Sequence, residues 1–345
     1  MSRRLAVVCR LFLALAVLAG CDGNAAAPLP AQIEAVFREA HEDGGFDGSV
    51  LVTRNGQSLY AGSFGLADID RKTPNSANTR FLVYSITKPV TAILVFQQIE
   101  AGKLGLDDRL EKFFPNLSAK PAGGITLRQL LTHTSGIEEL ITRHPDRRIT
   151  ASDLEAAIVV NPGKFAYSNS GFVCLTLVLE AVTGQGYAEL LDASILRPAG
   201  MQDSGTLKSG VAVAGLAVGY RVEGAHRVPS PIEVSPEAFV GAGSLYTTTG
   251  DLARFDQALN DGKLLPAKAQ AQMISEQVKG RGFGWSLDEQ GGKYFPWHQG
   301  AYRGYTAVLV LQVHRHEMIA ILSNDQDTDL LGLRSKVLRL LKRSP

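Results

Sequence analysis

Strand-forming patterns lie at both ends of this chain, and this arrangement restricts its fold more than any other feature. Residues 48–66 contain two β-forming runs on either side of the pair Asn55-Gly56. An Asn-Gly pair in that setting favours a two-residue hairpin turn. Residues 306–313 and 317–323 form a second expected hairpin near the carboxyl end. Two hairpins so far apart predict one antiparallel sheet that is closed by the two ends of the chain.

Helical patterns fill the rest of the chain. Residues 31–42 and 328–341 have amphipathic spacing, and residues 86–100 form a strongly apolar helical run. From about residue 104 to residue 240, short helical patterns alternate with Gly and Pro. We therefore predict an α+β fold, in which an antiparallel sheet is flanked by helices. A mostly helical subdomain is inserted at about 104–240, within a single domain of residues 31–345.

The first twenty residues have the pattern of a secretory signal. Arginines near the start precede an uninterrupted apolar run at residues 11–19, which is much shorter than the roughly 20 residues of a membrane-spanning helix. The run ends in Leu18-Ala19-Gly20-Cys21, which resembles the lipobox of bacterial lipoproteins. That resemblance implies a cleaved signal peptide at residues 1–20 and a lipid on Cys21. Residues 21–30 then form a short tether.

The lipoprotein interpretation has consequences for location, and it has one alternative. It predicts an exported protein that is anchored to a membrane through Cys21 and faces the periplasm of a bacterium. The alternative is an ordinary signal peptide, cleaved near Ala25-Ala26-Ala27. Asp22 implies the inner membrane by the enterobacterial rule, but this rule varies between bacteria, so the choice of membrane stays open.

The charge balance argues against nucleic acid as a partner. The chain has 35 Lys and Arg against 34 Asp and Glu, for a net charge of +1. Loss of residues 1–20, which contain three arginines and no acid, changes the net charge to −2. Neither value provides the basic surface that nucleic-acid binding requires. With Cys9 in the signal peptide and Cys21 lipidated, Cys174 stands alone, and no disulfide framework is expected.

Ser85 and Lys88 form a Ser-x-x-Lys pair at the expected start of the apolar helix. Positions i and i+3 share one face of a helix, so the lysine amine can approach the serine hydroxyl. A serine needs a base to become a nucleophile, and a lysine can act as that base where burial lowers its pKa. Alone, the pair is a weak signal, because a capping serine beside a solvated lysine gives the same pattern.

Tyr167-Ser168-Asn169 lies in a turn-rich loop that leads into another apolar helical run. A tyrosine can relay protons if a nearby ammonium lowers its pKa. Asn169 offers a donor and an acceptor to an amide substrate. An ordinary polar loop is the alternative interpretation of this triplet.

Trp297-His298-Gln299-Gly300-Ala301 is the third candidate segment, just before the final strands. A glycine beside a strand lets a ligand approach the backbone closely, and a neighbouring N–H can complete an oxyanion hole. A tight turn with a surface histidine is the alternative.

Together and in this order, the three segments resemble the active-site motifs of the serine β-lactamase and penicillin-binding-protein superfamily. Three intervening segments resemble the same family: residues 130–136 (LLTHTSG), 196–201 (LRPAGM) and 241–255 (GAGSL to DLARF). The resemblance runs from about residue 33 to residue 341. Its nearest branch is the class C β-lactamase-related group, which includes D-alanyl-D-alanine carboxypeptidases, D-aminopeptidases and family VIII esterases.

The resemblance implies a role for each matching residue. Ser85 is the acylated nucleophile, and Lys88 is its activating partner. Tyr167 is the acid/base that protonates the leaving group or activates the deacylating water. The backbone N–H groups of Ser85 and Ala301 form the oxyanion hole. The substrate-binding residues are Asn169, His298, Gln299 and Gly300.

The sequence departs from the family at His298, where strict β-lactamases and carboxypeptidases usually have lysine. Histidine has an unperturbed pKa near ~6.5 and is mostly neutral at physiological pH, so it suits a substrate carboxylate less well. Gln299 also replaces a commoner hydroxyl residue. We therefore expect weak β-lactam turnover and a preference for esters or peptides without a carboxylate at that site. Arg303 is a candidate compensating cation.

The sequence thus predicts an exported serine hydrolase that acts on ester or amide substrates through a Ser85 acyl-enzyme. A D-alanyl-D-alanine carboxypeptidase or β-lactamase is the alternative within catalysis, and a non-catalytic peptidoglycan- or peptide-binding lipoprotein is the alternative from another class. We expect no metal site and no organic cofactor. The expected partners are a small-molecule or peptide substrate and the membrane, and the oligomeric state stays open.

Overall fold

The computed structural model describes residues 27–224 and 226–344. The expected signal peptide at residues 1–20, Cys21 and most of the expected tether lie outside these residues. The first described helix, α1 (Leu29–Glu42), begins two residues earlier than the sequence pattern indicates. Pro30 lies in its first turn, where a proline is tolerated because the missing N–H has no partner within the helix.

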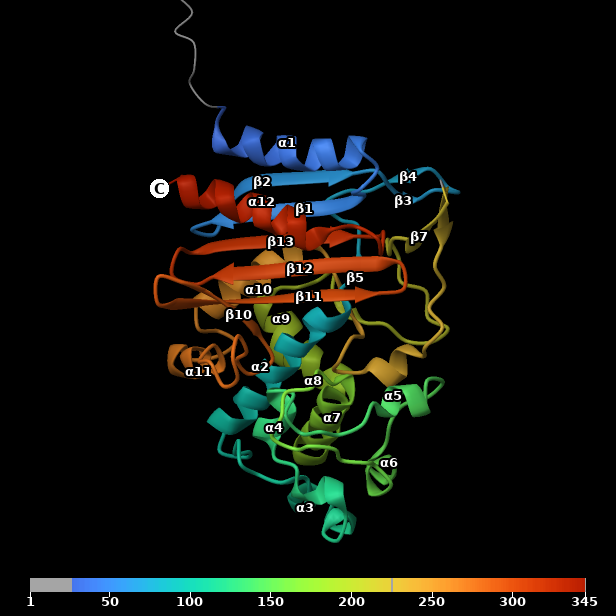
Figure 1. Ribbon diagram of the computed structural model, residues 1–345, viewed down its shortest axis with the longest axis vertical. Helices are drawn as coiled ribbons and strands as arrows, with labels where there is room; N and C mark the ends of the chain where they lie inside the picture. The colour runs from blue at the N-terminus through green and yellow to red at the C-terminus, as the bar shows by residue number, and fades with distance from the viewer. Residues whose placement is uncertain (1–26, 225, 345) are drawn as a thin grey trace, which may run out of the picture.

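One six-stranded antiparallel sheet organises the molecule, with the strand order β10-β11-β12-β13-β1-β2 (Figure 1). Gly48 of β1 lies opposite Ser323 of β13, so strands from the two ends of the chain pair with each other inside the sheet. The predicted α+β class with an antiparallel sheet is confirmed. The strands are β1 (Gly48–Arg54), β2 (Gln57–Phe64), β10 (Ser286–Gln290), β11 (Lys293–Tyr302), β12 (Tyr305–Gln312) and β13 (Glu317–Ser323).

The first hairpin has the predicted turn. Asn55 and Gly56 join β1 to β2 with φ angles of 52° and 72°. Positive φ at both central residues matches the right-handed twist of the flanking strands, and Asn and Gly tolerate it at the lowest cost.

The two faces of the sheet are covered by different helices. α1 and α12 (Leu330–Arg343) cover one face, where Phe37 and Val337 pack against Val308 and Val310 of β12. The alternate residues of β12, such as Leu309, belong to the larger core on the other face. This alternation follows from the two-residue period of a strand.

The larger core joins the sheet to the helical part of the chain. Its long helices are α2 (Thr87–Glu100), α7 (Asn169–Thr183) and α10 (Thr249–Asn260). The shorter helices are α3 (Leu110–Phe113), α4 (Leu127–Leu131), α5 (Leu140–Arg143), α6 (Ala151–Glu155), α8 (Tyr187–Leu191), α9 (Arg197–Ala199) and α11 (Ala267–Met273), with single turns η1 (Tyr84–Ile86), η2 (Pro115–Leu117), η3 (Pro121–Gly124), η4 (Asp192–Leu196) and η5 (Pro236–Phe239). The short strands are β3 (Leu66–Asp68), β4 (Thr73–Pro74), β5 (Phe81–Leu82), β6 (Gly205–Thr206), β7 (Tyr220–Glu223), β8 (His226–Pro229) and β9 (Leu245–Thr247).

Helix α2 lies between the sheet and the helical part, and this position brings its first turn to the site. Every residue from position 87 to position 96 is buried, because the helix has neighbours on all sides. Among the described residues no single helix is long and apolar enough to cross a membrane. Within the part of the chain that the structure describes, α7 taken together with residues 187–199, at an angle of 82°, is the one bent pair that meets the length and composition of a span.

Candidate active site

Ser85 lies in the single turn η1, directly before helix α2. The preceding residue, Tyr84, has a φ of 37°, which is unusual for a residue other than glycine. Strand β11 passes close by, and a Cβ added to Gly300 would lie 2.9 Å from the backbone nitrogen of Ser85. The absence of a side chain at Gly300 therefore allows β11 to approach the turn that carries the serine.

Lys88 lies one turn further along and is completely buried. Its Nζ lies 3.0 Å from Ser85 Oγ, and it donates hydrogen bonds to Asn169 Oδ1 at 2.8 Å and to Ala242 O at 2.9 Å. Burial lowers the pKa of Lys88 to about 7, and the charge of Glu139 acts in the opposite direction. A large share of Lys88 is therefore neutral near physiological pH, as a general base must be.

The contacts of Lys88 also determine where its lone pair points. A neutral amine has two N–H bonds and one lone pair. Asn169 Oδ1 and Ala242 O can only accept hydrogen bonds, so they take the two N–H groups. The lone pair then faces the third neighbour, the Ser85 hydroxyl. This arrangement prepares the serine to lose its proton to the lysine.

Tyr167 reaches the same serine from the loop before α7, and its hydroxyl donates to Ser85 Oγ at 2.8 Å. Burial raises the pKa of Tyr167 to about 12. The condition that a nearby ammonium lowers this pKa is not met, because desolvation of the phenolate outweighs the lowering effects of the Ser85 hydrogen bond and of the Arg281 charge. Tyr167 is therefore a neutral hydroxyl at physiological pH, so it is suited to donate a proton.

His133 fixes the position of the tyrosine ring. Its ring stacks on Tyr167 with 4.4 Å between ring centroids, and its Nδ1 accepts a hydrogen bond from Ser168 N at 3.1 Å. Burial, together with the charge of Lys88, holds the pKa of His133 well below its usual value. His133 is thus neutral and buried.

Asn169 is the first residue of α7, and Glu139 holds it in place. Glu139 Oε1 accepts from Asn169 N at 2.7 Å, and Oε2 accepts from Asn169 Nδ2 at 3.3 Å. The carboxylate therefore caps the positive end of this helix. Sequence reasoning missed Glu139, although it lies only three residues after the end of the LLTHTSG segment.

His298 lies inside strand β11, whereas the sequence pattern placed it just before the final strands. It is opposite Leu309 of β12, on the face of the sheet that meets α2, and it is only 5% exposed. Burial lowers the pKa of His298 to about 3, and its Nδ1 lies 2.7 Å from Gln299 O. The ring is therefore neutral and supplies no positive charge to a substrate.

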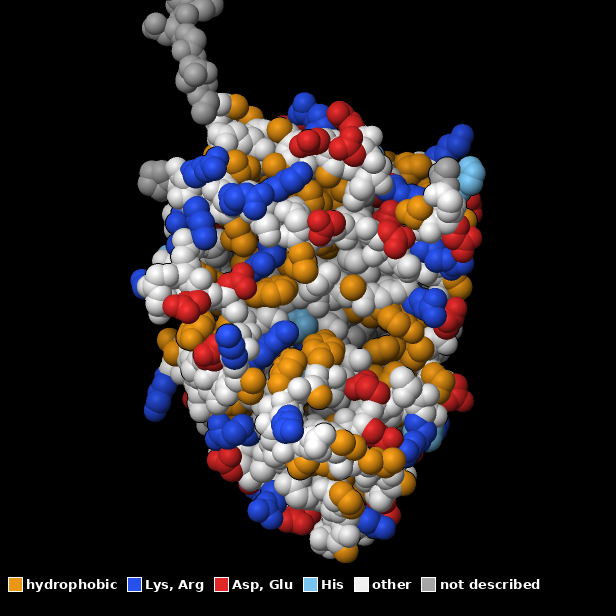
Figure 2. Space-filling view, viewed as in Figure 1, with side chains coloured by type: hydrophobic (Ala, Val, Ile, Leu, Met, Phe, Trp, Pro, Cys, Tyr) orange, Lys and Arg blue, Asp and Glu red, His pale blue; other side chains and the backbone are white. Residues whose placement is uncertain are grey.

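These residues meet at an open cleft of about 310 Å³. It corresponds to a hollow between the sheet and the helical part (Figure 2). Lys88, Asn169 and Gly300 are not among the residues that line it. The cleft is lined by Ser85, Tyr167, Arg281, Ser286, Trp297, His298, Gln299 and Ala301.

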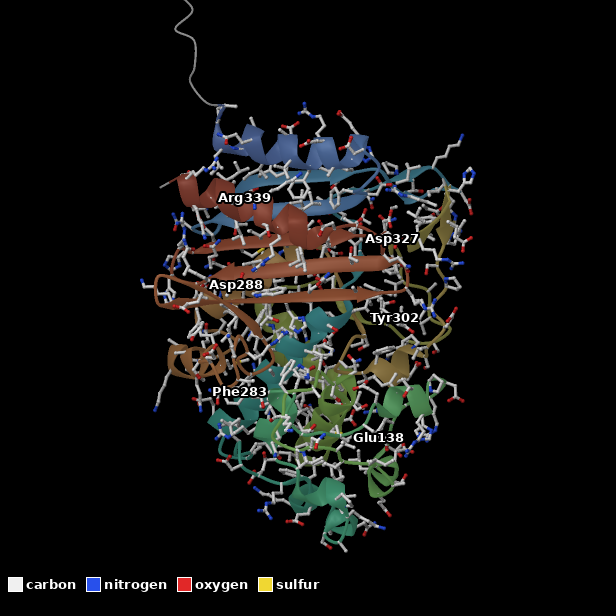
Figure 3. The ribbon with its side chains drawn as sticks, viewed as in Figure 1. Glu138, Phe283, Asp288, Tyr302, Asp327 and Arg339 are labelled. Atoms are coloured by element: carbon white, nitrogen blue, oxygen red, sulfur yellow. The ribbon has the colours of Figure 1, made fainter. Side chains whose placement is uncertain are left out.

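One edge of β11 is free beside this cleft. β10 pairs with β11 only as far as Trp297, so residues 298–302 have no strand partner on that side among the described residues. Figure 3 shows Tyr302 at the end of this stretch. An unpaired strand edge can bind the backbone of an extended peptide or a similar amide.

Arg281 is the cation of the cleft that sequence reasoning did not find. Its guanidinium donates to Ser286 Oγ and lies 5.2 Å from the ring centroid of Phe165. No motif surrounds it in the sequence, because only tertiary packing brings it to β11. The proposed compensating residue, Arg303, forms an ion pair with Glu233 instead and is not among the residues that line the cleft.

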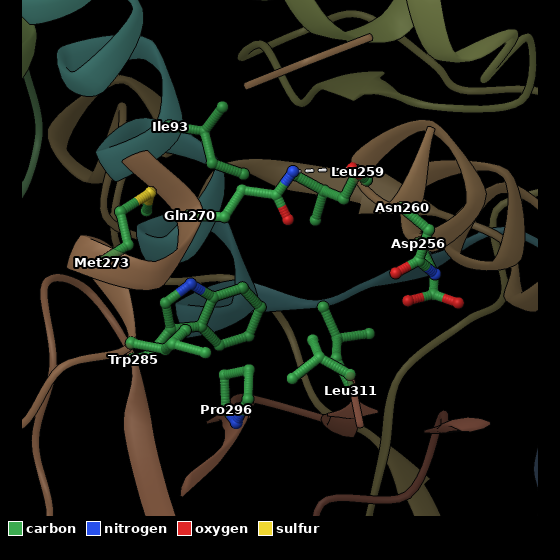
Figure 4. A pocket seen from close by; sticks show the side chains of 11 residues that line it. Ile93, Asp256, Leu259, Asn260, Gln270, Met273, Trp285, Pro296 and Leu311 are labelled. Atoms are coloured by element: carbon green, nitrogen blue, oxygen red, sulfur yellow. Dashed lines mark hydrogen bonds between the residues drawn. The ribbon is translucent and has the colours of Figure 1, made fainter. Parts of the chain in front are cut away.

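A smaller, mostly apolar pocket of about 40 Å³ lies between α2, α10, α11 and the sheet. Ile93, Met273 and Trp285 line one part of it, and Asp256 and Asn260 lie together at another part (Figure 4). None of the proposed catalytic residues lines this pocket. Among the residues that the structure describes, no cluster of three or more His, Cys, Asp or Glu could hold a metal ion.

Comparison with known proteins gives a consistent result. The family model described as Beta-lactamase matches residues 33–341. PbpX of Bacillus subtilis (strain 168), described as a penicillin-binding protein, is 32% identical over 305 residues, which cover 87% of this chain and 76% of that protein.

Solved structures of penicillin-binding proteins have the same fold. The protein from Bacillus halodurans has a TM-score of 0.78 at 24% identity, over 90% of this chain and 99% of that one. The octameric homologue from Pyrococcus abyssi also has a TM-score of 0.78, at 26% identity, over 91% of this chain and 77% of that one.

Proposed function

Because the chain belongs to the Beta-lactamase family, whose members include penicillin-binding proteins and other serine hydrolases, we propose that it hydrolyses esters or amides through an acyl-enzyme on Ser85. The observation that carries this proposal is the contact of Ser85 Oγ with Lys88 Nζ at 3.0 Å and Tyr167 Oη at 2.8 Å. One neighbour is a base that is partly neutral near pH 7, and the other is a neutral acid.

Acylation begins when Ser85 Oγ attacks the substrate carbonyl carbon while its proton moves to the lone pair of Lys88 Nζ. The carbonyl oxygen becomes an oxyanion, and the backbone N–H groups of Ser85 and Ala301 bind it. Collapse of this intermediate breaks the bond to the leaving group, which takes a proton from the Tyr167 hydroxyl. The proton held by Lys88 then restores the tyrosine, and the serine ester remains.

Deacylation repeats these transfers with water. A water molecule gives one proton to the Lys88 amine and attacks the ester carbonyl. Ser85 Oγ then leaves and takes that proton from the Lys88 ammonium, so the enzyme returns to its starting state and the product is a carboxylic acid. Asn169 keeps the lysine oriented throughout and can also face the substrate amide.

The neutral ring of His298 favours substrates without a carboxylate. We therefore propose uncharged esters and amides as the preferred class. A panel of p-nitrophenyl butyrate, nitrocefin and D-amino peptides, with Ser85→Ala as the blank, tests this preference. Higher efficiency on p-nitrophenyl butyrate supports it, and equal or higher efficiency on nitrocefin contradicts it.

Arg281 favours a second candidate, the hydrolysis of D-amino peptides or β-lactams that carry a carboxylate. Its guanidinium lies in the cleft with Ser85 and can form a bidentate pair with such a group. In the same panel, this candidate predicts higher efficiency on the carboxylate-bearing substrates. The non-catalytic alternative predicts binding without turnover on every member of the panel.

We further propose that the protein is an exported lipoprotein anchored through Cys21. The lipobox-like segment Leu18-Ala19-Gly20-Cys21 supports this. Labelling with an alkyne fatty acid in a bacterial host tests it: the wild type should carry the label in the membrane fraction, and Cys21→Ala should not. Equal labelling of both proteins contradicts the proposal.

A further inference from the structure

Glu139 is a half-buried carboxylate that lies behind the site. It accepts hydrogen bonds from Asn169 N, Asn169 Nδ2 and Ser170 N, at 2.7, 3.3 and 3.3 Å. None of the ion pairs between described residues includes it. The hydrogen bonds that its carboxylate accepts from described residues are thus all directed at the first turn of α7, where Asn169 meets Lys88.

These contacts determine which end of the Asn169 amide faces the lysine. An asparagine amide can be reversed with little change in shape, so only its hydrogen-bond partners fix its orientation. A carboxylate can only accept hydrogen bonds, so Glu139 must face Nδ2. Oδ1 then faces Lys88 Nζ at 2.8 Å. With the amide reversed, Nδ2 would meet the N–H groups of Lys88, and two donors would oppose each other.

Glu139 also places a negative charge near the catalytic lysine. Its charge raises the pKa of Lys88 and of Tyr167. The other ionisable groups around Lys88 are His133 from the loop after α4, His298 from β11, Tyr167 itself and, across the cleft, Arg281. Both histidines are neutral at physiological pH. Among the described residues around Lys88, Glu139 is therefore the anion that stabilises the ammonium formed on Lys88 when Ser85 loses its proton.

We propose that Glu139 is a positioning residue for the Ser85–Lys88 reaction. It fixes the Asn169 amide so that Oδ1 receives one N–H of Lys88 and the lysine lone pair stays on the Ser85 hydroxyl. This inference rests on the proposed acyl-enzyme function and extends it to a residue outside the three motifs.

Glu139→Gln tests the inference, because glutamine keeps the shape but adds a donor and removes the charge. The rate of Ser85 acylation by p-nitrophenyl butyrate should fall by about 10- to 100-fold on its plateau, since general-base assistance contributes about 10²–10⁴. The acid limb of the pH–rate profile should also move to lower pH by about half a unit to one unit, because loss of the negative charge lowers the pKa of Lys88. A merely structural role would lower the rate without moving the limb.

Two matched variants complete the experiment. Glu139→Asp keeps the negative charge. The acid limb of its pH–rate profile should therefore return toward that of the wild type, even if the shorter side chain leaves the rate reduced. Glu138→Gln alters the adjacent carboxylate, which lies in the helical part (Figure 3). That carboxylate accepts hydrogen bonds from the Arg143 guanidinium and from Ile158 N, at 2.8 Å each. This variant should match the wild type in both rate and limb.

The outcomes separate the inference from the proposed function. If the wild type forms no acyl-enzyme on Ser85, the proposed function fails, and the inference fails with it. If the wild type is acylated but Glu139→Gln keeps both its rate and its limb, only the inference is overturned. A folded Glu139→Gln with a reduced rate and an unmoved limb also overturns it, and circular dichroism establishes that the variant is folded.

Discussion

Gly300 lies so close to Val83 that a Cβ on the glycine would be 1.9 Å from the carbonyl oxygen of Val83. No side chain can be accommodated there without moving β11 away from the turn that carries Ser85. Gly300→Ala should therefore reduce kcat/KM for p-nitrophenyl butyrate at least about 100-fold, because misplacement of reacting groups by about 1 Å has an effect of that size. Gly186→Ala is the control, since Gly186 has a φ of −64° and open space around it. Similar losses in both variants would contradict this explanation.

The pKa of Lys88 determines the pH dependence of acylation. Burial lowers this pKa to about 7, and only the neutral amine accepts the Ser85 proton. The rate should rise with pH through an apparent pKa near 7 and then level off, so that at pH 5 it is about 100-fold below the plateau. Stopped-flow measurement of the acylation rate at about ten pH values between about 4.5 and 9 tests this. An acid limb of the acylation rate near pH 4 would contradict this, because it would identify a carboxylate or His298 as the base.

Arg281 should matter only for substrates that carry a negative charge. Arg281→Ala should lower kcat/KM for nitrocefin about 10-fold more than for p-nitrophenyl butyrate, since a charge-assisted hydrogen bond contributes about 1.5–3 kcal/mol. Arg303→Ala removes a cation that pairs with Glu233 outside the cleft, so it should leave the ratio of the two efficiencies unchanged. Equal effects of Arg281→Ala on both substrates would rule out carboxylate recognition by this residue.

Asp256, in the apolar pocket, makes stability depend on pH. Burial raises its pKa to about 6, so the folded protein holds this proton more tightly than the unfolded chain. The stability contributed by the neutral carboxyl is complete below the unfolded pKa of about 3.9 and is lost as the pH rises through about 6. Asp256→Asn should therefore raise the free energy of unfolding by about 1–2 kcal/mol at pH 8 and by much less at pH 4. Urea titrations at both pH values check this, and an equal gain at both would contradict it.

Local signals account for the parts of the fold that the sequence predicts well. Asn55-Gly56 specifies its turn through its own backbone preferences, and Ser85 and Lys88 share a helix face through their spacing. The sequence does not predict that β11 continues through His298, because Pro296 and Gly300 weaken the strand pattern there. Pairing with β12 stabilises the strand in the folded protein.

The remaining features depend on packing between distant segments. Arg281 and Glu139 reach the site through tertiary contacts that no local pattern encodes. The direction of the Tyr167 pKa shift likewise depends on the groups that distant segments place around the phenol, which spacing along the chain cannot specify.

The central claim is that Ser85 forms the covalent intermediate with help from Lys88. A fluorophosphonate probe reacts with activated serine hydroxyls, and peptide mass spectrometry identifies the modified residue. We expect a single adduct on Ser85 in the wild type, none on Ser85→Ala, and labelling slowed by at least about 100-fold in Lys88→Ala, since it lacks the general base. An unlabelled wild type, or an equal adduct on Ser85→Ala, would contradict the account.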